Sequence, residues 1–145
     1  MTEDRQVGET RIGQKEYETL AEVRYALRKL LRFSELTALA NGATPQQYQA
    51  LQAIKGFPSR SAVTIGELAE RLQLQHHSTV GLVNRLVSQG LVQREHSTTD
   101  RRQMHVVLTA KGELLLEQLT VAHLAEWRRI APSLSQLLLQ IAEDE

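Results

Sequence analysis

Apolar residues recur every three or four positions between Lys15 and Ala40. This spacing is typical of an amphipathic helix with one buried face. Residues 1–14 before it are polar and show little periodicity, which favours a mobile tail. After a break at an Asn-Gly pair, Thr44 and Pro45 provide the cap and first position of a second helix. Its inner stripe is predicted to contain Tyr48, Leu51 and Ile54.

Two shorter helices are predicted beyond a loop at residues 55–62. Thr64 and Glu67 have the spacing of a capping box, which places the start of a helix over residues 65–72. A short turn separates it from a second helix that ends before Gly90, where a left-handed residue is favoured. The inward face of this second helix is predicted to consist of Thr79, Leu82, Val83 and Leu86.

Residues 91–95 and 103–108 are predicted to be two strands joined by a hydrophilic turn. Thr109 is predicted to cap a long helix, Pro132 to interrupt it, and residues 133–141 to form a last short helix. Two short helices with a tight turn, followed by a hairpin, define a winged helix-turn-helix. The expected fold class is therefore mainly α with a small β-hairpin wing, flanked by N- and C-terminal helices.

Composition narrows the class of protein. The chain has 145 residues, of which 41% are hydrophobic, so neither a disordered chain nor a membrane protein is favoured. No apolar run approaches the roughly 20 residues of a membrane span, and the polar start does not resemble a signal peptide. The sequence has no cysteine, which excludes a disulfide framework and a thiolate metal site. A cytoplasmic protein is expected.

The formal net charge is zero, but the charges are unevenly distributed. Residues 60–105 contain six arginines against four acidic residues, whereas residues 106–145 contain three basic residues against six acidic ones. Because local charge decides where a polyanion docks, the basic middle of the chain is compatible with a DNA partner.

The hydrophilic turn between the two predicted strands contains Arg101 and Arg102. Arginine at a wing tip can enter a narrow minor groove with strongly negative potential. Asp100 lies two positions before Arg102, so in an extended backbone both side chains project on the same side and the carboxylate would orient the guanidinium. These three residues and Arg94 form the predicted DNA-binding wing. A solvated, charged hairpin tip is the alternative.

The second short helix is sized to enter a major groove. Its outward residues are the other candidates for DNA contact, although simple exposure explains each of them equally well. Asn84 could pair with an adenine edge or touch a phosphate, and Val80 could pack on a thymine methyl group. The two adjacent histidines point about 100° apart, which makes them poor metal ligands. The predicted set is Gln75, His76, His77, Ser78, Val80, Gly81, Asn84 and Arg85.

Three stretches, together with their order and spacing, resemble the MarR family, the multiple-antibiotic-resistance-type regulators: "ATPQQYQAL", "TIGELAERLQLQHHSTVGLVNRLVSQGLV" and "DRRQMHVVLTAKG". The resemblance implies a homodimer with interlocking terminal helices, which binds a pseudo-palindromic operator, usually as a repressor. It also implies release by a small phenolic or otherwise lipophilic ligand. The family's Asp-x-Arg wing motif maps onto Asp100 and Arg102, and its recognition helix onto Gln75–Gln89. By the same analogy, four aromatic residues are candidate pocket walls, with core packing as the alternative: Tyr17, Tyr25, Phe33 and Tyr48.

Three positions depart from the family's pattern. Gln73 stands where a turn glycine is common, Gln75 where a serine-type cap is usual, and Gly81 where a basic residue is common. These differences affect the expected base sequence more than the expected role. Gly81 either lets the helix backbone approach a duplex closely or simply relaxes the helix.

The resulting division has four parts: a mobile tail at 1–14, a dimerisation helix at 15–43, a winged helix-turn-helix DNA-binding domain at 44–108, and dimerisation helices at 109–145. A winged-helix module used only for protein assembly is the alternative function. The sequence has no Ser/His/Asp set, phosphate-cradling glycine loop or credible pair of working carboxylates, so neither an enzyme nor a cofactor is expected.

Overall fold

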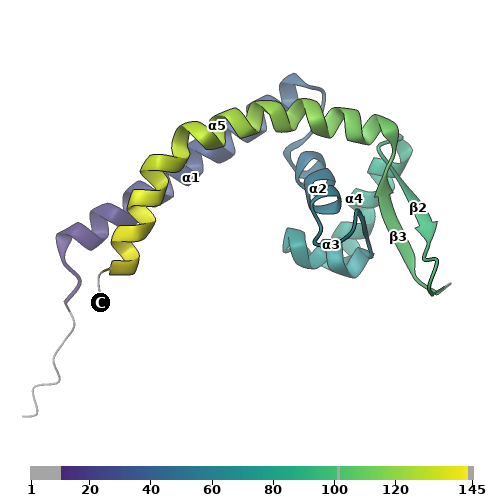
Figure 1. Cartoon of the computed structure of the whole chain (residues 1–145), viewed down its shortest axis with the longest axis horizontal. Helices are drawn as coiled ribbons and strands as arrows, with labels where there is room; N and C mark the ends of the chain where they lie inside the picture. Colours follow the sequence, from purple (N-terminus) through teal and green to yellow (C-terminus); the bar gives the residue numbers. More distant parts are fainter. Residues whose placement is uncertain (1–10, 101, 144–145) are drawn as a thin grey trace, which may run out of the picture. The chain divides into compact units, whose positions relative to one another are not determined.

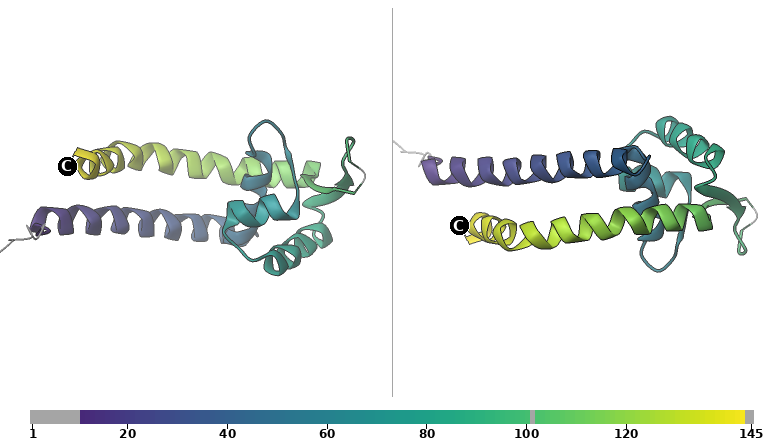
Figure 2. Two further views of the ribbon diagram at one scale, coloured as in Figure 1. Left: turned by 90° about the horizontal axis from the view of Figure 1, so that it is seen from below. Right: turned by 90° about the horizontal axis from the view of Figure 1, so that it is seen from above.

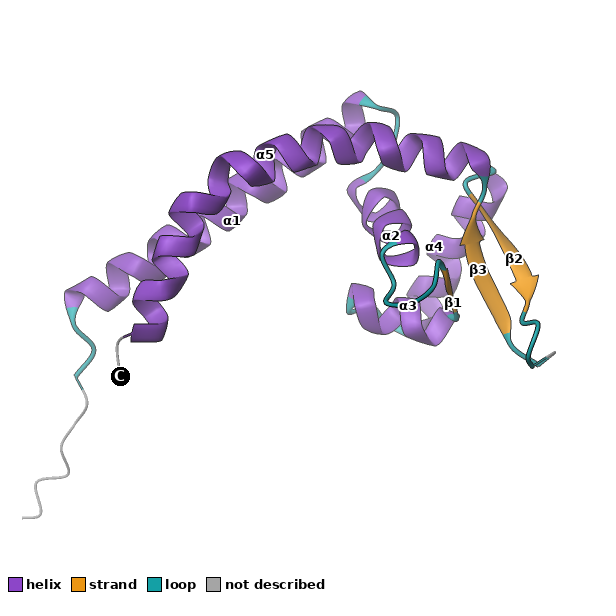
Figure 3. Ribbon diagram, in the orientation of Figure 1, coloured by secondary structure: helices purple, strands orange, loops and turns teal. Residues whose placement is uncertain are grey.

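The computed structural model describes residues 11–100 and 102–143 (Figure 1). These residues form five helices and one three-stranded sheet (Figure 3). In chain order the elements are α1 (Gln14–Ala40), α2 (Pro45–Lys55), β1 (Ala62–Val63), α3 (Ile65–Leu72), α4 (His76–Ser88), β2 (Val92–His96), β3 (Met104–Leu108) and α5 (Ala110–Glu143). Residues 1–10 of the predicted tail lie outside the described residues, and Gln14, its last residue, is the first residue of α1.

The chain divides into two compact units, one built from Met1–Leu31 and Glu126–Glu145 and the other from Arg32–Ala125. In the first unit, the early part of α1 and the late part of α5 run side by side (Figure 2). The Thr19 hydroxyl is buried, donates to the Lys15 carbonyl at 2.9 Å and lies 3.5 Å from Gln140 Oε1. Many apolar side chains of this unit remain exposed, among them Tyr17, Leu20, Tyr25, Leu31, Trp127, Leu138, Leu139 and Ile141.

The second unit contains the winged module around a core of aliphatic side chains. Tyr48, Leu51 and Ile54 of α2 are buried, as their spacing predicted. The predicted inward face of α4 is also buried, and it packs with Leu68 of α3 and Leu119 of α5 in one cluster. Burying a leucine or isoleucine side chain contributes about 1.5–3 kcal/mol, so this cluster fixes the orientation of α4.

Both predicted helix starts in this unit have complete capping boxes. Thr44 caps α2 and pairs reciprocally with Gln47, and Thr64 caps α3 and pairs reciprocally with Glu67. Each box satisfies two backbone N–H groups that the helix itself leaves free, which stabilises the start of the helix by about 0.5–2 kcal/mol.

The sheet has the order β1-β3-β2, and both pairings are antiparallel. The hairpin of β2 and β3 was predicted, and Val92 pairs with Leu108 while His96 pairs with Met104. β1 was not predicted, because residues 55–62 were interpreted as a loop. That interpretation is wrong at Ala62, which together with Val63 pairs with β3. A two-residue strand is too short to show the alternation that identifies strands in sequence.

The C-terminal segment is one helix, so the predicted break at Pro132 and the separate last helix are wrong. Thr109 caps α5, with its hydroxyl accepting from the Gly112 N–H at 3.1 Å, and the helix continues through Pro132 to Glu143. Proline removes one backbone donor, and this proline is exposed. Leu134 and Leu137 beyond it are partly buried, which indicates that packing in the first unit holds the helix together across the proline. None of the described helices is apolar over a stretch that would span a bilayer.

Candidate nucleic-acid interface

The turn between α3 and α4 sets the direction of the second helix. Gln73 adopts a left-handed conformation at φ 54° and ψ 44°, which explains why glycine is common at this position. A residue with a Cβ atom loses about 1–2 kcal/mol in this region. The Gln73 side chain compensates in part, because its amide donates to the Glu70 carbonyl at 2.7 Å. The departure from glycine is therefore compatible with the same tight turn.

The outward face of α4 carries the predicted major-groove contacts. His76, His77, Ser78, Asn84 and Arg85 are exposed, while Val80 and Gly81 are partly buried. Gln75 is the N-cap and makes no side-chain capping bond, as its departure from serine suggested. The first backbone N–H groups of α4 therefore have no side-chain cap, and such groups are favourable partners for anions. No three His, Asp or Glu side chains gather as a possible metal site in the part of the chain that the structure describes.

A network of backbone contacts organises the tip of the wing. Ser97 is buried at 8% exposure, and its hydroxyl accepts from the N–H groups of Thr99 and Asp100, both at 3.3 Å. The Asp100 carboxylate accepts from the Arg102 N–H at 3.0 Å. The prediction of an extended segment, with this carboxylate beside the guanidinium, is therefore wrong. The segment is a turn, and Asp100 binds the backbone N–H of Arg102 instead. Ser97 was not among the predicted site residues, although Ser-x-x-Asp is a recognisable turn pattern.

Arg102, presented by this turn, is exposed. Its neighbour Arg101, the other predicted tip arginine, lies outside the described residues. A folded turn that fixes the backbone of Arg102 reduces the backbone conformational entropy that this segment loses on binding a partner. The sequence predicted that Asp100 orients the guanidinium of Arg102, whereas the structure shows its carboxylate bonded to the Arg102 backbone N–H.

A direct bond connects the wing to α4. An Nη atom of Arg94, on β2, donates to Oδ1 of Asn84 on α4. Both residues were predicted as separate DNA contacts, and neither prediction anticipated that they bind each other. The elements are distant enough in sequence that spacing alone gave no signal for the pair.

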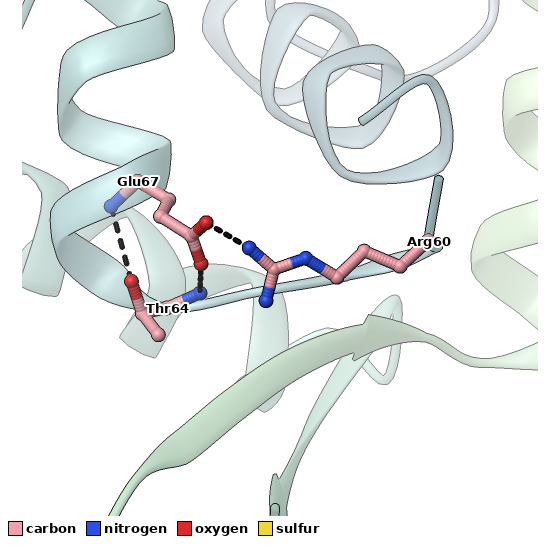
Figure 4. Close-up of polar contacts among 3 residues, drawn as sticks. All are labelled: Arg60, Thr64 and Glu67. Carbon is pink, nitrogen blue, oxygen red and sulfur yellow. Dashed lines mark hydrogen bonds and ion pairs between the residues drawn. The ribbon is translucent and has the colours of Figure 1, made fainter. Parts of the chain in front are cut away.

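A second basic cluster lies around Phe57, before β1. The guanidinium groups of Arg60 and Arg71 lie 4.8 and 5.0 Å from the centre of the Phe57 ring. Figure 4 shows that Arg60 also pairs with Glu67, whose other oxygen accepts from the Thr64 N–H at 3.0 Å. Glu67 thus partly neutralises the charge of Arg60, so Arg60 adds little to the positive potential of residues 60–105.

Glu67 is ionised more readily than an ordinary glutamate. Desolvation raises its pKa, but hydrogen bonds with Thr64 and the charges of Arg60 and His105 outweigh this effect, and the pKa of Glu67 lies below its usual range. A capping carboxylate that stays charged strengthens the start of α3 through the helix dipole.

Two of the four aromatic residues proposed as pocket walls, Phe33 and Tyr48, lie against a buried histidine that the sequence had not indicated, whereas Tyr17 and Tyr25 are exposed. His123 of α5 is 3% exposed and stacks on Tyr48 with ring centres 4.1 Å apart, while Phe33 meets it edge-on. Its Nδ1 donates to the Leu119 carbonyl at 2.7 Å, because a carbonyl can only accept, and Nε2 lies 2.8 Å from the Ser34 hydroxyl. Burial raises the pKa of Tyr48, and a hydrogen bond with Thr120 opposes that shift. These side chains are packed as core.

Comparisons with known proteins agree with this geometry. A sequence model of the MarR family matches residues 41–103. The transcriptional repressor MdtR of Bacillus subtilis is 27% identical over 95 residues, an alignment that covers 66% of this chain and 59% of that protein. The crystal structure of AbsC, a MarR family transcriptional regulator from Streptomyces coelicolor, has a TM-score of 0.72 at 22% identity, with 93% of this chain and 97% of that chain covered. RV1404 from Mycobacterium tuberculosis also has a TM-score of 0.72 at 22% identity, with coverages of 94% and 98%.

The two short helices, the tight turn between them and the β2–β3 hairpin define a winged helix-turn-helix protein. Residues 41–103 match the sequence model of the MarR family, and the fold resembles that of AbsC, a MarR family transcriptional regulator. This family regulates transcription and is not enzymatic, in agreement with the absence of catalytic motifs from the sequence.

Proposed function

We propose that this chain is a sequence-specific DNA-binding transcriptional regulator that acts in the cytoplasm. It binds a pseudo-palindromic operator as a homodimer, represses transcription, and is released by a small lipophilic or phenolic ligand. The main support is the division of α4 into two faces. Its inner face is completely buried, while the outer face presents histidine, serine, asparagine and arginine side chains beside a hairpin that carries Arg102.

The residues have separate roles in this proposal. The first turns of α4, from His76 to Val80, read base edges in the major groove, where side chains can distinguish all four base pairs. Arg102 enters the adjacent minor groove, and Asp100 holds the turn that presents it. Arg85 is exposed near the end of α4 and supplies a phosphate contact, which orients the helix without reading sequence.

A homodimer is supported by the apolar side chains that the first unit leaves in water. Leu31 is 60% exposed, Leu139 59% and Trp127 42%. Soluble monomers rarely expose so many large apolar groups in one region. We expect sedimentation at micromolar protein concentration to give a dimer, in which two copies of α4 lie about 34 Å apart, one turn of duplex. A monomer at that concentration would contradict this part of the proposal.

Release by a ligand is supported by a cleft of about 400 Å³ in the second unit, beside the end of α4. Gln89, the C-cap of α4, lines it together with Gln47, Lys111, Leu91 and Leu115. Lys111 Nζ donates to the Gln89 carbonyl at 2.8 Å. A ligand in this cleft contacts groups that hold the end of α4. It changes the free energy of DNA binding by at most the difference between its binding free energies for two positions of the helix.

The proposal is tested by selecting bound fragments from a random duplex library. The expected result is a consensus with two inverted half-sites, and its complex with the protein should dissociate when small aromatic acids that bind the protein are added. Retention without any sequence preference, or no salt-sensitive retention at all, would favour the alternative of a module for protein assembly.

A further inference from the structure

The bond between Arg94 and Asn84 restricts what the outer face of α4 can read. Asn84 is exposed on the face opposite the buried side of the helix, and Oδ1 of its amide accepts from the Arg94 guanidinium. Arginine has donors only, so the atom that faces it must be the amide oxygen and not the nitrogen. The chemistry of Arg94 thereby fixes which end of the amide points toward the wing.

The amide group is planar, and its oxygen and nitrogen diverge from a common carbon. With the oxygen directed at Arg94, the two hydrogens of Nδ2 lie on the other arm of the amide and take no part in this bond. Nδ2 makes no hydrogen bond to another residue within the described ranges. The free part of the Asn84 side chain is therefore a donor, while its acceptor is already occupied.

Bases differ in how well they match such a donor. An asparagine that pairs with adenine in the major groove uses both ends of its amide, since its oxygen accepts from N6 and its nitrogen donates to N7. Guanine presents two acceptors, O6 and N7, and needs only donors from the protein. We infer that Arg94 is a positioning residue that turns Asn84 into a reader of guanine rather than adenine. This inference rests on the proposed DNA-binding function and concerns the specificity of that same interface.

The assignment also changes the role of Arg94. Instead of contacting DNA directly, Arg94 connects β2 to α4, so the base that Asn84 reads depends on a residue of the wing. A variant without the guanidinium frees the amide to rotate by half a turn and to pair with adenine. The wild-type preference then weakens or reverses, although Arg94 itself touches no base.

The test compares affinities within a set of duplexes. Starting from the selected operator, each half-site position is changed to all four base pairs, and Asn84→Ala identifies the position whose discrimination depends on Asn84. At that position we expect the wild type to prefer guanine over adenine by about fivefold or more. Arg94→Met should bring this ratio close to one or invert it, whereas Arg94→Lys, which retains a donor, should preserve much of it.

Because the ratio compares two duplexes at one salt concentration, the lost charge of Arg94 cancels from it. Gln93→Met is the matched control. Gln93 is exposed on the same strand, and its side chain pairs with Glu95 on the face of β2 opposite Arg94. This variant should leave the ratio unchanged. An adenine preference in the wild type, no position that depends on Asn84, or an unaltered ratio in folded Arg94→Met overturns the assignment. Absence of specific binding in the wild type refutes the proposed function itself.

Discussion

Gly112, in the first turn of α5, is where a single methyl group should disturb the fold most. Alanine at this position places a Cβ atom 2.0 Å from the Leu91 carbonyl oxygen and 3.0 Å from its carbon. Leu91 is 5% exposed, and its oxygen already accepts from the Thr109 N–H at 3.0 Å. The obstacle is buried backbone, which cannot rotate away as a flexible side chain would. The start of α5 and Leu91 must therefore separate by about 1 Å before the methyl group fits.

The size of the effect follows from three contributions. Overpacking against a rigid neighbour costs about 1–3 kcal/mol. Weakening the bond between Thr109 and Leu91 costs about 1 kcal/mol more, and the better helix propensity of alanine returns roughly the same amount. We therefore expect Gly112→Ala to lower the free energy of unfolding by about 1–3 kcal/mol.

Gly66→Ala is the matched control for this prediction. Gly66 is exposed in α3, and a Cβ atom there meets only the Thr64 hydroxyl, at 3.9 Å. This variant should be as stable as the wild type or more stable by up to about 1 kcal/mol. Both are measured by urea unfolding followed by circular dichroism at one protein concentration, because dimerisation makes stability depend on concentration. If Gly112→Ala were as stable as Gly66→Ala, the close packing of α5 on Leu91 would be refuted.

Three further predictions concern the wing, the core and a helix cap. Arg102→Ala should weaken operator binding by about 1–3 kcal/mol in a gel-shift titration, and unchanged affinity in a folded variant would remove Arg102 from the interface. His123→Ala should lower the free energy of unfolding, measured by urea titration, by about 2–4 kcal/mol. His123→Phe keeps a stacked ring and should lower it by less, and equal losses in the two variants would contradict the stacking on Tyr48. Glu67→Gln should be less stable than the wild type at pH 7, because the lowered pKa of Glu67 means that its ionised form stabilises the fold. The difference in stability should shrink as the pH falls below about 5, because Glu67 becomes protonated in the folded protein. A constant difference down to pH 3 would contradict a stabilising role for the charge of Glu67.

The elements with strong local signals were predicted well from the sequence. The capping pairs at Thr44 and Thr64 and the glycine at position 90 have short-range causes, and each element begins or ends as expected. The inward face of α4 was identified because its burial follows from helical spacing alone. These features depend on residues a few positions apart, which a single sequence displays directly.

Features that depend on contacts between distant segments were missed. Pro132 was expected to end a helix, since its local cost is visible in the sequence and the packing that outweighs it is not. His123 gave no signal, because its partners lie on α1 and α2. At the candidate interface, the sequence indicated Arg94 and Asn84 but not the hydrogen bond between them. It also predicted that Asp100 would contact the guanidinium of Arg102, whereas the carboxylate binds the Arg102 backbone N–H.

The most direct test of the central claim, that α4 and the wing bind duplex DNA, is the salt dependence of binding to the selected operator. Fluorescence anisotropy titrations between 50 and 200 mM salt should show that the affinity of the wild type falls steeply, with a linear plot of log affinity against log salt concentration. Arg102→Ala should bind more weakly and reduce the slope by about one. Binding that does not respond to salt, or an identical slope and affinity in the variant, would contradict the account.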